Sequence, residues 1–269
     1  MKNNTFFNKI LLAGGALLIS GTFASCDNIA EDDRYIEVDA VVPERVVLIE
    51  DFTGQNCVNC PDAHEVIEAL QQQYGDAVVP VSIHAGAFAI SKNNPRILGL
   101  GTEEGTYYNN SYNISSWPQG VINGRGGACD YGTWASTVRA ELLRPTTLSI
   151  DLDADLEGNE IKIDVELIPH EDIEGQLLIW VIEDGIVAQQ ISKSNGLMPE
   201  YVHNNVFRAA VNGVDGEKVS LEKSIHKGNT YSIPLRDEKN EKWNPDNISV
   251  IAFVKSADGV EQVAKAPLK

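Results

Sequence analysis

The feature that most constrains the fold is a pair of cysteines between a strand-like run and a helix-like run. Residues 45–52 (RVVLIEDF) are mostly β-branched or apolar, which is typical of a parallel strand buried on both faces. The C-x-x-C pair Cys57 and Cys60 follows after a short turn. Apolar residues then recur at helical spacing over residues 63–74, and a second strand-like run covers residues 77–83. The sequence therefore predicts a β-α-β unit with the cysteine pair at the start of its helix.

A cysteine pair at the start of a helix is chemically suited to thiol–disulfide exchange. The unpaired amide hydrogens and partial positive charge of a helix N-terminus stabilise a thiolate, so we expect Cys57 to be the nucleophile. Cys60, one helical turn further on, would then attack a mixed disulfide at Cys57 and release the reduced partner. The pair exchanges two electrons by itself, so the sequence predicts no cofactor.

The order strand, C-x-x-C, helix, strand resembles thioredoxin-like proteins. The resemblance implies a buried carboxylate that assists proton transfer, and the matching position is Asp51, six residues before Cys57. Because Glu50 and Asp51 are adjacent, strand alternation should send only one of them inward. The resemblance also implies a cis-proline loop that docks the substrate chain, for which the candidate residues are Trp117 and Pro118.

The same segment leaves a metal site open as an alternative. Cys60 and His64 lie four residues apart on one helical face and could bind zinc or copper together with Cys57 and His84. Lone histidines near a helix are more often structural or surface groups, and no second C-x-x-C follows, so we expect no metal. Cys129 is expected to be a buried, inert thiol.

Residues 85–110 form an insertion between the second strand-like run and the proline loop. The segment is rich in Asn, Gly and Tyr and lies where a lid or recognition loop would lie.

The last part of the chain has a different pattern. A helical segment at residues 134–143 ends the first region, and Arg144-Pro145 marks a boundary. Period-two runs separated by turn signals follow, at residues 147–154, 160–167, 176–183, 230–235 and 248–255. The expected fold class is therefore α/β plus all-β: a thioredoxin-like domain at residues 45–144 and an immunoglobulin-like β-sandwich at residues 145–269.

The N-terminal residues have the features of an export signal. Residues 1–25 place Lys2 and Lys9 before a short apolar core. The small residues directly before Cys26 resemble the lipobox of bacterial lipoproteins, which implies that Cys26 is acylated and becomes the new N-terminus. Residues 26–44 would then be an acidic tether, and no further run is long enough to span a membrane.

The charge of the chain excludes one class of partner. There are 21 basic and 39 acidic residues, for a formal net charge of −18. This sign is wrong for binding a phosphate backbone or an anionic membrane surface by electrostatics. We expect no nucleic-acid partner, and membrane contact only through the N-terminal lipid.

Three stretches resemble the Omp-28 family of Bacteroidota outer-membrane lipoproteins. They are residues 50–61 with the C-x-x-C pair, residues 201–213 (YVHNNVFRAAVNG) and residues 243–247. The resemblance implies a thioredoxin-like domain followed by a β-sandwich, lipid-anchored at the outer membrane and facing the periplasm or the cell surface. Adhesin and receptor labels have been attached to members of this family.

Two functions from different classes remain open. The first is thiol–disulfide exchange on exported proteins, with Cys57 attacking, Cys60 resolving, Asp51 assisting proton transfer and Pro118 docking the substrate. This function should leave the sulfur of Cys57 partly exposed beside a cis Trp117–Pro118 bond. The alternative is a surface adhesin or receptor in which Cys57–Cys60 is a structural disulfide and the sandwich binds a ligand.

Overall fold

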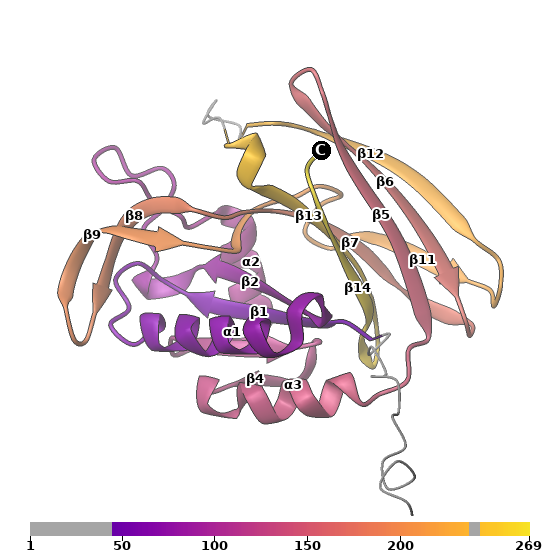
Figure 1. Ribbon diagram of the computed structural model, residues 1–269, viewed down its shortest axis with the longest axis horizontal. Helices are drawn as coiled ribbons and strands as arrows, with labels where there is room; N and C mark the ends of the chain where they lie inside the picture. The colour runs from indigo at the N-terminus through magenta and orange to yellow at the C-terminus, as the bar shows by residue number, and fades with distance from the viewer. Residues whose placement is uncertain (1–44, 237–242) are drawn as a thin grey trace, which may run out of the picture. The chain divides into compact units, whose positions relative to one another are not determined.

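The structure is a computed structural model that describes residues 45–236 and 243–269, shown as coloured ribbon in Figure 1. The described residues belong to one compact unit. The predicted signal segment, the acidic tether and the lipidation candidate Cys26 lie outside the described residues.

The described chain is a mixed α/β fold, with about half of its residues in strands. Its helices are α1 (Cys60–Tyr74), α2 (Glu103–Ser111) and α3 (Trp134–Leu142), with short 3₁₀ turns at Gly75–Ala77, Gly86–Phe88, Tyr131–Thr133 and Pro245–Asn247. Its strands are β1 (Val47–Thr53), β2 (Val78–His84), β3 (Gln119–Ile122), β4 (Arg125–Cys129), β5 (Leu148–Glu157), β6 (Glu160–Pro169), β7 (Ile173–Glu183), β8 (Ile186–Ser192), β9 (Gly196–His203), β10 (Val206–Ala210), β11 (Glu217–Leu221), β12 (Lys227–Pro234), β13 (Ile248–Ser256) and β14 (Gly259–Pro267).

The predicted β-α-β unit is confirmed. Strands β1 and β2 pair in parallel, from Val47 opposite Val78 to Thr53 opposite His84, and α1 connects them. Every residue of β1 and β2 is buried, as the nearly continuous apolar runs indicated.

A nine-stranded sheet forms the centre of the fold. Its order is β14-β13-β7-β10-β2-β1-β3-β4, and β11 pairs with β7 beside β10. Strand β7 pairs with β13 along one edge and with β10 and β11 along the other. Strand β10 joins β7 to β2 through the parallel pair Val206 and Ser82. One sheet therefore contains strands from before and after the boundary expected at residue 144, which falls between α3 and β5.

The two faces of this sheet are covered by different elements. Helix α2 packs on one face, over apolar side chains that include Leu48, Trp180 and Phe253. On the other face, α1 and α3 cover the β1 end, with Trp134 at the centre of their contact. The β7–β13 end of that second face packs on a three-stranded sheet of order β12-β6-β5. In Figure 1 this smaller sheet lies at the right, away from α1 and α3.

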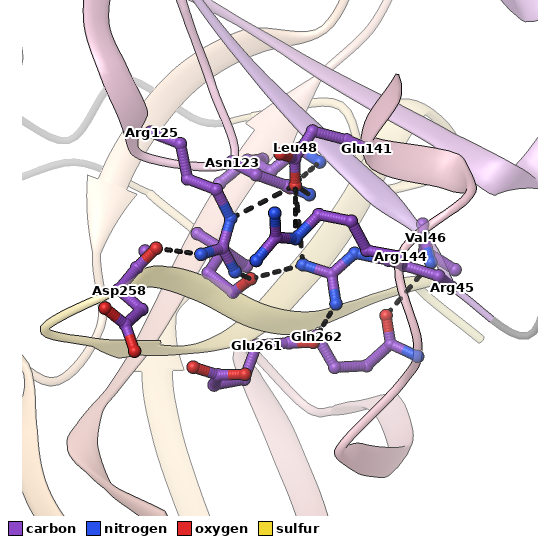
Figure 2. A network of polar contacts seen from close by, with 12 residues as sticks. Arg45, Val46, Leu48, Asn123, Arg125, Glu141, Arg144, Asp258, Glu261 and Gln262 are labelled. Carbon is purple, nitrogen blue, oxygen red and sulfur yellow. Dashed lines mark hydrogen bonds and ion pairs between the residues drawn. The ribbon is translucent and has the colours of Figure 1, made fainter. Parts of the chain in front are cut away.

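A network of arginines joins the beginning of β1 to the β13–β14 hairpin (Figure 2). Arg45 is almost completely buried, and its guanidinium donates to three backbone carbonyls, those of Val260 (2.7 Å), Glu261 (3.1 Å) and Pro145 (3.2 Å). Glu141 on α3 accepts from Arg125 at 3.1 Å and lies 3.6 Å from Arg45. The network thus connects the first described strand to the last two.

Candidate functional site at the C-x-x-C pair

Cys57 and Cys60 form a disulfide at the N-terminus of α1. Their Cα atoms are 5.5 Å apart, Cys60 is the first residue of the helix, and Pro61 follows in the first turn. Cys57 lies in the turn after β1, where its amide donates to the carbonyl of Gly54 at 3.0 Å. The sequence placed both cysteines correctly relative to the helix.

The expected exposure of Cys57 is wrong. Cys57 is 2% exposed and Cys60 is completely buried, whereas the two residues between them are exposed. The cause is the β8–β9 hairpin, whose residues 189–193 bond to the C-x-x-C turn. The contacts are Ile191 N to Gln55 O (2.8 Å), Lys193 N to Val58 O (2.9 Å), and the Gln190 side-chain amide to Cys57 O (3.0 Å). In Figure 1 this hairpin extends from the main sheet at the left.

The hairpin was not predicted. Its signal was present, since Asn195-Gly196 between two β-prone runs favours a tight hairpin turn. Its position against residues 55–58 could not be inferred, because more than a hundred residues separate the two segments.

The insertion at residues 85–110 also contacts the C-x-x-C turn. The side-chain amide of Gln55 donates to the carbonyl of Leu98 at 2.9 Å, and its oxygen accepts from the amide of Leu100 at 2.9 Å. The fully buried Gln55 therefore connects the turn to this insertion.

Both carboxyl groups of β1 are buried, which corrects the expectation that only one would point inward. Glu50 is 2% exposed and Asp51 is 0% exposed, because β1 is an inner strand with covered faces on both sides. Asp51 lies on the face of α1, where its Oδ2 is 3.6 Å from Nε2 of His64. Burial raises the pKa of Asp51 to about 8, and the hydroxyl of Ser82 opposes this shift. The carboxyl of Asp51 is therefore mostly protonated at neutral pH.

His64 connects Asp51 to the hairpin. Its Nε2 lies 3.2 Å from the hydroxyl of Thr53, and its Nδ1 lies 2.9 Å from the hydroxyl of Tyr201 on β9. Burial lowers the pKa of His64 to about 3, with a further contribution from His203. The imidazole is therefore neutral at neutral pH, so one ring nitrogen donates while the other accepts.

Two further histidines extend this polar layer. The rings of His84 on β2 and His203 on β9 are 5.1 Å apart, and the ring of Tyr201 is 4.8 Å from that of His203. Burial lowers the pKa of His203 to about 4 and that of His84 well below its ordinary value. Sequence reasoning did not assign a role to Tyr201 or His203, although both lie in the stretch that carried the family resemblance.

The Trp117–Pro118 peptide bond is cis, which is the isomer expected from the sequence. Gln119, the next residue, pairs with Phe52 near the C-terminal end of β1, from which the C-x-x-C turn departs. The ring of Trp117 packs 5.6 Å from that of Phe88 and directly over Gly86, where an added Cβ would lie 2.0 Å from the indole. The docking role of Pro118, which is itself buried, stays a prediction.

Within residues 45–236 and 243–269, no group of three or more His, Cys, Asp or Glu side chains is arranged to hold a metal ion. Cys129 is a free thiol on β4, half-buried rather than fully buried as expected, and its sulfur donates to the carbonyl of Gly120 at 3.3 Å. No helix in the described part of the chain is long and apolar enough to cross a membrane.

The fold and the site define a mixed α/β protein with a disulfide-bonded C-x-x-C at a helix start, covered by a β-hairpin. The family model described as "Outer membrane protein Omp28" matches residues 105–269, which is more than half of the chain. The chain belongs to the Omp28 family of outer-membrane proteins. The matched range includes the proline loop and the hairpin but begins after the C-x-x-C pair.

Two solved structures are similar to the chain at low sequence identity. The crystal structure of protein AGR_C_4864 from Agrobacterium tumefaciens is 16% identical, covers 82% of this chain and 94% of its own, and has a TM-score of 0.53. A domain of the outer membrane lipoprotein Omp28 from Porphyromonas gingivalis is 19% identical, covers 47% of this chain and 91% of its own, and has a TM-score of 0.33. The first of these supports the fold. No curated protein matches the chain.

Proposed function

We propose that this protein carries out thiol–disulfide exchange on exported proteins, using Cys57 and Cys60 within a thioredoxin-like region at residues 45–144. The strands that follow residue 145 belong in this proposal to an immunoglobulin-like region that selects or presents partners. Export by residues 1–25 and acylation of Cys26 would hold the protein at the membrane through the tether of residues 26–44.

The buried carboxyl of Asp51 is the observation that carries the proposal. Among the residues that the structure describes, no cationic side chain contributes to the pKa of Asp51. Burying such a group without a charged partner costs free energy. A disulfide that only fastens a turn has no use for it, whereas an exchanging disulfide needs a proton donor for its leaving thiolate.

The reaction can be written from the disulfide form. A partner thiolate attacks the sulfur of Cys57, the Cys57–Cys60 bond breaks, and Cys60 leaves with the electron pair as a thiolate. Asp51 gives this thiolate its proton. A second thiolate of the partner then attacks the partner's own sulfur in the mixed disulfide, and Cys57 leaves with the electron pair. The partner becomes a disulfide, and the pair becomes a thiol at Cys60 and a thiolate at Cys57.

Access to Cys57 requires part of the hairpin to move. The groups that bond to residues 55–58 come from residues 189–193, from the register shift toward the tip of the hairpin. A register shift between Ala188 and Gln190 separates this tip from the base of the hairpin. We infer that the tip bends away at this irregularity while the base stays in place.

The test combines a reduction potential with a trapping variant, both in a Cys129→Ser background that removes the free thiol. We expect the potential of Cys57–Cys60 to lie above about −300 mV, within reach of glutathione. We also expect Cys60→Ser to retain exported proteins as mixed disulfides at Cys57 that dithiothreitol releases. The Cys57→Ser/Cys60→Ser double variant is the matched control and should retain none.

The receptor alternative has one observation in its favour, namely the burial of both cysteines beneath a bonded hairpin. It predicts a potential below about −300 mV and no trapped partner. That pair of results would replace the exchange proposal with a structural disulfide.

A further inference from the structure

The carboxyl of Asp51 has no direct contact with solvent. The carboxyl is completely buried, so a proton that it gives to Cys60 cannot be replaced directly from water. Repeated exchange therefore needs a connection between Asp51 and the surface.

One chain of polar groups leads outward from Asp51. His64 Nε2 lies 3.6 Å from Asp51 Oδ2, with the hydroxyl of Thr53 beside it at 3.2 Å from the same nitrogen. On the far side of the ring, Nδ1 lies 2.9 Å from the hydroxyl of Tyr201, a residue that is itself partly exposed. The histidine is 14% exposed, so the ring is largely enclosed between the carboxyl and the tyrosine.

We propose that His64 and Tyr201 conduct a proton from solvent to Asp51 while the Cys57–Cys60 disulfide is reduced. The inference rests on the proposed function and adds to it two positioning residues that act on the cysteines through Asp51. Tyr201 comes from the hairpin and His64 from α1, so the path joins the covering element to the reactive one.

The proton transfers balance without any co-reactant. The thiolate of Cys60 takes the proton of Asp51, and the carboxylate of Asp51 takes the proton on Nε2 of His64. Nδ1 of His64 takes the hydroxyl proton of Tyr201, whose oxygen is reprotonated by water. His64 changes tautomer and one proton enters from solvent, while the electron pair comes from the partner thiolate. The low pKa of His64 fits a group that passes a proton without holding a charge.

The hairpin can open over Cys57 while this path stays assembled. Tyr201 pairs with Ala188 at the base of the hairpin, on the near side of the register shift, whereas the contacts to the C-x-x-C turn begin within the shift, at Gln189, whose carbonyl accepts from Gln55 at 3.2 Å. Lifting the tip therefore exposes the disulfide without removing Tyr201 from His64.

Other titratable groups around the path come from each packed element. They are Asp51 on β1, Glu65 and Glu68 on α1, His84 on β2 and His203 on β9. The two histidines are neutral near pH 7, and the two glutamates raise the pKa of Tyr201, which reaches about 12 chiefly through burial. Tyr201 is therefore a hydroxyl donor throughout the range in which Asp51 titrates.

The experiment measures the rate of reduction of Cys57–Cys60 by glutathione, and the reverse rate with oxidised glutathione, over a range of pH. In Tyr201→Phe only the hydroxyl is lost, and we expect both rates to fall about tenfold while the reduction potential is unchanged. Tyr231→Phe is the matched control, since Tyr231 lies on β12 of the three-stranded sheet and its hydroxyl bonds to Glu217 on β11 at 2.7 Å, away from the path. The control should react at the wild-type rate.

Two further variants separate proton transfer from packing. His64→Ala should slow exchange to a similar degree, and added imidazole should restore its rate by occupying the vacated space. The His64→Ala/Tyr201→Phe double variant should be no slower than the slower single variant, because both residues serve one path.

Each outcome decides the inference. A purely structural contact between Tyr201 and His64 would loosen the hairpin when lost, so Tyr201→Phe would react at the wild-type rate or faster, and the path would be overturned. If the wild-type pair resists glutathione altogether and Cys60→Ser traps no partner, the proposed function fails and the path fails with it. Normal wild-type exchange with an unaffected Tyr201→Phe overturns the path alone.

Discussion

The two carboxyl groups of β1 are neighbours in the chain, yet they lie on opposite faces of one sheet in different surroundings. Glu50 lies on the face of α2, where the amine of Lys255 and the hydroxyl of Tyr112 both favour its charged form, and burial still raises its pKa to about 7. Asp51 lies on the face of α1, where only Ser82 opposes burial, and its pKa reaches about 8.

The groups around each carboxyl account for the difference between the two pKa values. On the α2 face, Lys255 donates to Tyr112 at 2.8 Å and lies over its ring, next to an aromatic cluster in which Trp180 donates to Tyr108. On the α1 face the neighbours of Asp51 are the neutral imidazole of His64 and the hydroxyl of Ser82. A carboxyl beside a cation is stabilised as a charge, whereas one beside neutral polar groups keeps its proton and can deliver it.

The largest expected effect is a change in how the free energy of unfolding depends on pH in Asp51→Asn. The pKa of Asp51 rises from 3.8 in the unfolded chain to about 8 in the folded one, so the folded state holds a proton that the unfolded state releases. Wild-type stability should therefore be lost as the pH rises through this window, whereas Asn does not titrate. As the pH rises from about 4 to about 9, the free energy of unfolding of Asp51→Asn should therefore increase by roughly 3 to 5 kcal/mol relative to that of wild type.

Urea unfolding of wild type, Asp51→Asn and Glu50→Gln at several pH values checks this prediction. In Glu50→Gln the free energy of unfolding should also increase relative to wild type as the pH rises, but by less, because the pKa of Glu50 rises only from 4.5 to about 7. Equal gains in the two variants would remove the distinction between the two faces.

The next effect is on exchange itself. In Asp51→Asn, glutathione should reduce Cys57–Cys60 about a hundredfold more slowly near pH 7, because the leaving thiolate loses its proton donor. Glu50→Gln, on the other face, should stay within about twofold of wild type. A comparable loss in both variants would mean that the rate follows general packing rather than the proton of Asp51.

A smaller effect tests the cation on the α2 face. Lys255→Met should raise the pKa of Glu50 further and lower the free energy of unfolding at about pH 8 by about 1 to 2 kcal/mol. In a Glu50→Gln background, Lys255→Met should lower the free energy of unfolding much less. A double-mutant cycle of wild type, the two single variants and the double variant measures the coupling between Lys255 and Glu50. An undiminished effect in that background would place the role of Lys255 elsewhere, for example in its bond to Tyr112.

The smallest effect concerns the hairpin on the α1 face. Gln190→Met keeps the volume of the side chain but removes its bonds to the carbonyls of Gly54 and Cys57. Exchange with glutathione should become up to about fivefold faster, as expected for the loss of about 1 kcal/mol from the closed state. A slower reaction would show that the tip does not limit access to Cys57.

Local patterns in the sequence predicted the local part of the site. Helical spacing after Cys60 identified α1, continuous apolar runs identified β1 and β2, and the period-two runs correspond to β5, β6, β7, β12 and β13. The cis bond at Pro118 was also predicted correctly. Each of these signals lies within one short window of residues.

What the sequence could not provide is contact across long separations. Tyr201 and His64 are 137 residues apart, and nothing in either segment indicates the other. For the same reason the sequence did not predict that both carboxyls of β1 are buried or that β10 pairs with β2, because each depends on contacts between elements far apart in the chain. The exposure of Cys57 was mispredicted for this reason.

The connection between Arg45 and Val260 bears on the order in which the chain can fold as it is made. Arg45 emerges 215 residues before Val260, whose carbonyl it binds. Until β10 arrives, the outer edge of β2 has no partner, and an unpaired inner strand readily joins another chain. Closure of the sheet must therefore wait for strands made long after β1 and β2, so this protein is expected to need protection from self-association until β10, β13 and β14 are complete.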